Sequence, residues 1–91
     1  MSYRVEYTNP AKKALRKMSG AQRDLILSWI DKNLAGTEDP RIFGKALQGN
    51  LRQYWSYRVK DHRILALIQD EVLTILVVKI ADRKDVYGSS V

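Results

Sequence analysis

Residues 52–80 read RQYWSYRVKDHRILALIQDEVLTILVVKI, and this stretch decides the fold. Its β-branched, aromatic and aliphatic residues fall into three segments, which is typical of strands separated by turns. We predict strands over residues 52–59, 63–68 and 72–80. The two connections are only three residues long, at 60–62 and 69–71, which favours an antiparallel meander. The last segment is almost continuously apolar, so we expect it to lie deepest in the sheet.

The N-terminal segment begins with a second strand pattern. Residues 3–7 alternate apolar and charged side chains, which predicts a short strand at an edge or at the start of the sheet. Thr8 and Pro10 then suit the N-cap and the first turn of a helix over 11–18. We expect its core-facing residues to be Ala14, Leu15 and Met18.

A second helix is predicted between Ser19, a good N-cap, and Gly36, a common terminator. Its apolar residues recur at helical spacing. They are Ala21, Leu25, Ile26, Trp29, Ile30 and Leu34. Residues 37–40 break the pattern, and 41–50 are predicted to be a connecting loop with at most a turn of helix.

The order strand, helix, helix, then three strands indicates one α+β domain over residues 1–91. A helical hairpin would cover one face of a twisted sheet and leave the other face available for binding. With 16 Lys and Arg against 10 Asp and Glu, the net charge is +6, which favours an anionic partner such as nucleic acid or an acidic protein.

Composition also excludes several functional classes. The sequence has no cysteine, which rules out disulfides, thiolate zinc sites and a thiol nucleophile. It has no apolar run of the roughly 18 residues that a membrane span needs, and its first residues lack a signal-peptide pattern. We therefore expect a cytoplasmic protein with no membrane partner.

Aromatic and cationic residues are most concentrated at 54–63, YWSYRVKDHR. Strand alternation places Arg58 and Lys60 on one face if no bulge intervenes, and Arg63 on the next strand can lie beside them. A second cationic run, RKDVY at 83–87, follows the last strand. Cross-strand packing of the rings, with solvated cations at the strand ends, is the alternative explanation.

These two runs, together with the order of elements, resemble the RelE/ParE toxin superfamily. The similarity extends from the first strand through KALQG at 45–49 to Tyr87. It implies a RelE-like fold and the toxin of a type II toxin–antitoxin system. The RelE branch implies an mRNA interferase that cleaves translated mRNA in the ribosomal A site, thereby inhibiting translation. The nucleophile would be the RNA 2′-hydroxyl, with no metal and no cofactor.

The resemblance also implies roles for individual residues. Arg63 and Arg83 would stabilise the phosphate in the transition state, which suits their rigid guanidinium forks. Arg58 and Lys60 would hold the RNA and assist proton transfer, and Tyr87 would stack on or orient the nucleotide. Further RNA-binding residues are expected to be Lys45, Arg52 and Lys84. The proton acceptor is left open.

The sequence departs from the family at two places. Asp82 stands where several RNA-cleaving relatives carry a basic residue, and its carboxylate would repel phosphate unless it turns away or pairs with a neighbouring cation. The connector has Gly44 and Lys45 where relatives that use a glutamate–histidine pair keep the glutamate, so that chemistry is not available here. His62, the only histidine, is expected to pack at the hairpin turn.

Two other functions stay open at this stage. A ParE-like toxin would inhibit DNA gyrase without nuclease activity, and a degenerate toxin would act only as an antitoxin partner or DNA-bound corepressor. Either toxin implies a RelB-like antitoxin whose acidic or amphipathic segment covers the basic face. Contact with operator DNA would then be indirect, through the antitoxin complex. The basic helix at 12–17 would contact the antitoxin or ribosomal RNA, or would simply be solvated.

Overall fold

The computed structural model describes residues 1–82, and residues 83–91 lie outside the described part. Its regular elements follow the predicted order. They are β1 (Arg4–Tyr7), α1 (Asn9–Lys17), α2 (Gly20–Asn33), β2 (Lys45–Ala46), β3 (Trp55–Val59), β4 (His62–Gln69) and β5 (Thr74–Asp82), with 3₁₀ turns η1 (Gly49–Leu51) and η2 (Asp70–Val72).

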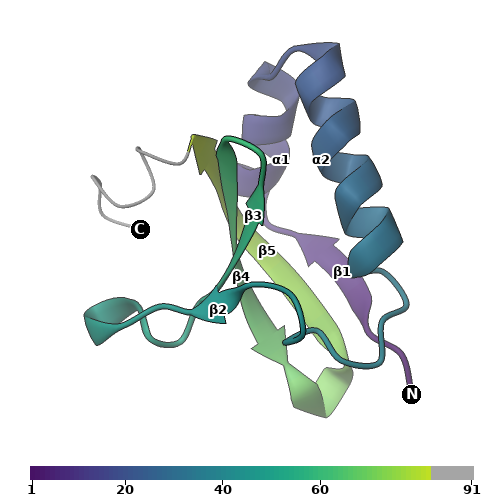
Figure 1. Cartoon of the computed structure of the whole chain (residues 1–91), viewed down its shortest axis with the longest axis vertical. Coiled ribbons are helices and arrows are strands. Elements are labelled where there is room, and N and C mark those ends of the chain that lie inside the picture. Colours follow the sequence, from purple (N-terminus) through teal and green to yellow (C-terminus); the bar gives the residue numbers. More distant parts are fainter. Residues whose placement is uncertain (83–91) are drawn as a thin grey trace.

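The strands form one mixed sheet in the order β1-β5-β4-β3-β2. β3, β4 and β5 make the predicted antiparallel meander, and β1 pairs in parallel with β5 at one edge. Figure 1 shows β1 and β2 on opposite sides of the sheet, with the two helices side by side. The α+β class and the edge position of the first strand are therefore confirmed.

Both helices begin at the predicted caps. The Thr8 hydroxyl accepts a hydrogen bond from the amide of Ala11 at 3.3 Å, and the Ser19 hydroxyl accepts one from Gln22 at 3.3 Å. The hairpin between them is closed by Arg23, whose Nε donates to the carbonyl of Leu15 at 2.8 Å. This bond satisfies a carbonyl at the C-terminal end of α1.

The core lies between the helices and one face of the sheet. Its buried residues are Ala11, Leu15, Ile26, Ile30, Leu34, Tyr57, Val59, Ile64, Ala66, Ile75, Val77 and Ile80. Ala14 and Met18 pack against it as expected. Two residues of the α2 stripe do not: Ala21 is exposed, and Leu25 is 38% exposed because it lies at the margin of the helix–sheet contact.

Most strand boundaries lie within two residues of the predictions, and the largest difference is at the start of β3. β3 begins at Trp55 rather than at 52, because the chain leaves η1 through a turn in which Tyr54 N donates to Leu51 O. β5 begins at Thr74, because Leu73 adopts a left-handed conformation with φ 48°. The short strand β2 falls in a segment predicted to be a loop.

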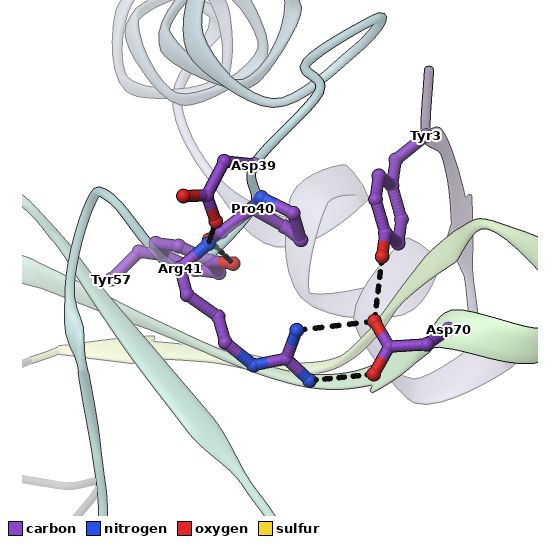
Figure 2. A network of polar contacts seen from close by, with 6 residues as sticks. All are labelled: Tyr3, Asp39, Pro40, Arg41, Tyr57 and Asp70. Carbon is purple, nitrogen blue, oxygen red and sulfur yellow. Dashed lines mark hydrogen bonds and ion pairs between the residues drawn. The ribbon is translucent and has the colours of Figure 1, made fainter. Parts of the chain in front are cut away.

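A polar network anchors the connector between α2 and β3 (Figure 2). Arg41 donates to both oxygens of Asp70, at 3.1 and 3.0 Å, and the Tyr3 hydroxyl donates to the same carboxylate at 2.6 Å. The buried Tyr57 hydroxyl donates to the carbonyl of Pro40 at 2.6 Å. The charged hydrogen bond from Arg41 lowers the pKa of Asp70. These contacts fix the segment that leads into β2.

Candidate nucleic-acid interface

The sheet face opposite the helices carries the cations that the sequence singled out. Arg58 on β3 and Arg63 on β4 are direct cross-strand partners. The core residues Tyr57 and Ile64 are also partners and point towards the helices. By alternation, the two arginines therefore point to the other face. Their predicted proximity is confirmed.

A β-bulge in β5 adds Lys79 to this face. Leu65 pairs with Lys79, but the next residue, Ala66, pairs with Val77, so Val78 is the extra residue. Val77 and Ile80 are both buried in the core, whereas Lys79 lies between them in the chain and is only half-buried. Lys79 thus points away from the helices, on the strand next to the one that carries Arg63.

Lys45 extends the same face at the β2 edge. It pairs with Ser56, which lies two residues before Arg58 on β3. Arg58 is exposed, and its Nε donates a hydrogen bond to the carbonyl of Lys60 at 3.3 Å. We call Lys45, Arg58, Arg63 and Lys79 the cationic face. Four cations from four strands can bind successive phosphates or surround one of them.

Lys60 does not join the cationic face. It occupies the two-residue turn between β3 and β4 with φ 52°, so strand alternation does not extend to it. It instead lines a surface hollow next to α2 that it shares with Leu25 and His62. The expectation that Arg58 and Lys60 share a face is therefore wrong, because β3 ends at Val59 and Lys60 belongs to the turn, where strand alternation no longer applies.

The other predicted residues lie elsewhere. Arg52 follows η1 and lines a separate hollow with Arg41 and Trp55, at the end of β3 opposite to Arg58. Arg83, Lys84 and Tyr87, predicted for catalysis and RNA binding, lie outside the described residues. Their roles, like those of Lys45, Arg58, Lys60, Arg63 and Arg52, stay predictions.

Asp82 and His62 both lie on the helix side of the sheet. They are cross-strand partners, and His62 also pairs with the buried Val59, which faces the core. The Asp82 carboxylate is therefore directed away from Arg63, which removes the repulsion that its position in the sequence suggested. His62 lies beside Leu25 rather than on the cationic face.

Lys79 is the residue of this face that sequence reasoning missed. Simple alternation from Ile75 and Val77 assigns position 79 to the buried side, and only the bulge reverses this. The sequence did contain one signal, a lysine within a nearly continuous apolar strand. Because burying an ammonium group is costly, such a lysine is expected to point out of the core.

Within residues 1–82, no three His, Cys, Asp or Glu side chains are grouped in a way that could hold a metal ion. In the same part of the chain, no helix combines the length and the apolar character that crossing a membrane requires.

Comparison with known proteins relates this architecture to bacterial toxins. Toxin RelG of Mycobacterium tuberculosis is 28% identical over 87 residues, covering 96% of this chain and 98% of RelG. A chain in the RelBE2 toxin–antitoxin complex of the same organism is 25% identical with a TM-score of 0.82, covering 91% of this chain and 93% of its own. The isolated E. coli RelE toxin, 22% identical, shares the fold with a TM-score of 0.72 over 96% of this chain and 93% of RelE.

A family model describing the ParE toxin of the type II toxin–antitoxin system parDE matches residues 5–87. This match includes both helices, the sheet from the second residue of β1 onwards and the cationic run at 83–87. The chain therefore belongs to the ParE toxin family of type II toxin–antitoxin systems, within the RelE/ParE toxin superfamily.

Proposed function

We propose that this toxin is an mRNA endonuclease that cleaves translated mRNA in the ribosomal A site and thereby inhibits translation. The observation that carries the proposal is the cross-strand pair Arg58–Arg63, with Lys79 on the adjoining strand. Like charges directly opposite each other in a sheet destabilise it. A bound phosphate would relieve the repulsion between the two arginines, since each guanidinium can donate a charge-assisted pair of hydrogen bonds to phosphate oxygens.

The proposed chemistry needs no metal ion and uses the RNA 2′-hydroxyl as nucleophile. The protein must align this hydroxyl with the phosphorus and stabilise the charge that develops on the phosphate oxygens. Arg63 is half-buried and Arg58 exposed, so Arg63 is the more rigid donor and Arg58 the more adaptable one. Arg83 would complete the phosphate site, and Tyr87 would orient the nucleotide.

We further propose that the toxin acts in the cytoplasm and that its partner is a RelB-like antitoxin. RelB-type chains accompany similar toxins in the complexes from M. tuberculosis and E. coli. An acidic or amphipathic segment of the antitoxin would neutralise the cationic face, and its association would be sensitive to salt. Operator DNA would be reached only through that complex. The whole chain would act as one toxin domain.

Inhibition of DNA gyrase is the second candidate, because the matching family model is that of ParE toxins. In that case the chain would cleave no RNA, and the cationic face would contact a protein instead. The similarity to Toxin RelG and to a chain of the RelBE2 complex favours the RelE branch, and with it the nuclease.

Primer extension on mRNA from cells that express the toxin tests the proposal. We expect discrete cuts inside translated codons, and we expect them to vanish in Arg63→Ala, Arg83→Ala. The control is Lys32→Ala, which removes an exposed cation of α2 outside the predicted RNA contacts and should leave the cuts unchanged. If growth stops while the mRNA stays intact and gyrase loses its supercoiling activity, the nuclease is refuted and gyrase inhibition is supported.

A further inference from the structure

Lys79 borders a cavity that the proposed chemistry does not use. The cavity has a volume of about 400 Å³ and lies at the β5 edge beyond the last residue of β1. It is lined by Pro10, Ala14, Tyr54, Val78, Lys79 and Ile80. Its size falls within the range of small-ligand sites. The lining residues are apolar except for Lys79 and Tyr54.

The bulge that turns Lys79 outwards also shapes this cavity. Val78 is the extra residue of β5, and it lines the cavity together with the two residues that follow it. α1 contributes Pro10 and Ala14 to the lining, and the half-buried residue Tyr54 is its aromatic member. A cation, an aromatic ring and an apolar hollow thus meet at the margin of the cationic face.

We propose that Lys79 and this cavity form a nucleotide subsite, in which the ammonium binds a backbone phosphate and the cavity receives the base of that nucleotide against Tyr54. The inference rests on the proposed function, because it extends the path of the RNA from Arg58 and Arg63 across β5. It assigns an RNA contact to a residue outside the predicted set.

The chemistry of the lining matches a nucleotide better than a purely apolar ligand. A splayed single-stranded base has two π-faces that stack on tyrosine, and its sugar–phosphate carries the negative charge that Lys79 complements. The half-buried stem of Lys79 restricts where its ammonium can reach, which fixes the phosphate relative to the cavity. The register places Lys79 diagonally across from Arg63, whose direct partner is Ala81, so an RNA strand that contacts both side chains would cross from β4 to β5.

Binding of a short 2′-O-methyl RNA, which lacks the free nucleophile and cannot be cut, tests the subsite. Fluorescence anisotropy across a salt series should show that Lys79→Gln reduces the slope of log K against log salt by about 0.7, the value for one phosphate contact on single-stranded RNA. Lys79→Arg should restore the slope. Lys32→Gln, an exposed helical lysine, is the control of equal charge change and should leave it unaltered.

The variant Tyr54→Leu tests the contribution of base stacking separately from that of the Lys79 charge. It should weaken binding roughly 5- to 150-fold, the effect of losing one base stack, while the salt slope stays at the wild-type value. A urea titration of each variant confirms that the fold is retained, and Tyr54→Trp, which keeps an aromatic face, should bind more tightly than Tyr54→Leu.

The outcomes distinguish this inference from the proposed function. If the wild type cuts mRNA but Lys79→Gln behaves like Lys32→Gln and Tyr54→Leu binds as tightly as the wild type, the subsite is refuted and the nuclease stands. A cavity that holds an apolar side chain of a protein partner would give that result. If the wild type neither binds nor cuts RNA, both proposals fall.

Discussion

Replacing Tyr57 with phenylalanine tests how the connector to β2 is held. The Tyr57 side chain is fully buried, and its hydroxyl donates to the carbonyl of Pro40 at 2.6 Å. Phenylalanine keeps the ring, which packs 5.8 Å from Trp29 between centroids, so the substitution removes only the hydrogen bond. Because Pro40 is itself buried, water does not readily replace the lost donor.

Leaving a buried carbonyl unsatisfied should lower the free energy of unfolding by about 1–3 kcal/mol. For a domain of this size the melting temperature should fall by on the order of 4–24 °C. Thermal and urea unfolding followed by circular dichroism measure both quantities. The matched control is Tyr3→Phe, which deletes the hydroxyl that donates to the exposed Asp70 and should cost less, because water takes its place. Equal losses in the two variants would refute the argument from burial.

Two further predictions concern the same region. The hydrogen bond from Arg41 is the chief cause that lowers the pKa of Asp70 in the folded protein. The ionised carboxylate therefore stabilises the fold above the pKa of the unfolded chain, and this stabilisation is lost below about pH 4, as the pH falls through the pKa of the folded state. Urea titrations at several pH values should therefore show that Asp70→Asn flattens the acid limb, by at most about 1 kcal/mol because the pair is exposed to solvent. Gly44→Ala should cost at least about 2 kcal/mol in the same assay, because the residue has φ +80° and its added methyl group would meet the backbone carbonyl of Ser56. Gly36→Ala, at φ +79° but in open space, should cost only about 1 kcal/mol, and an equal cost in both would contradict the steric argument.

The elements that the sequence predicts well are those encoded by local signals. The caps Thr8 and Ser19 mark the starts of the helices, and their hydroxyls accept the expected amide hydrogen bonds. The strands of the meander follow from their β-branched residues and short turns. Arg58 and Arg63 were expected to lie side by side, because a tight hairpin between them leaves little freedom in the register.

Contacts between distant segments left no such signal. β2 has only two residues, both exposed. It forms because contacts with residues far away in the sequence hold the connector in place. Arg41 and Asp70 are 29 positions apart, and nothing in either neighbourhood specifies their pairing. Trp55 contributes as well, since its indole nitrogen donates to the carbonyl of Phe43 at 2.7 Å. The position of Lys45 on the cationic face thus depends on tertiary contacts.

The bulge at Val78 has the largest effect on the charge of the site. Without it, the alternation set by Ile75 and Val77 would turn Lys79 towards the helices and Asp82 towards the arginine pair. With it, Lys79 joins the cationic face and Asp82 leaves it. One extra residue therefore adds a positive charge to this face and removes a negative one, which is a difference of two charges where phosphate would bind. Whether Asp82 affects phosphate binding thus depends on the face of β5 to which its side chain points, and not on the residue type alone.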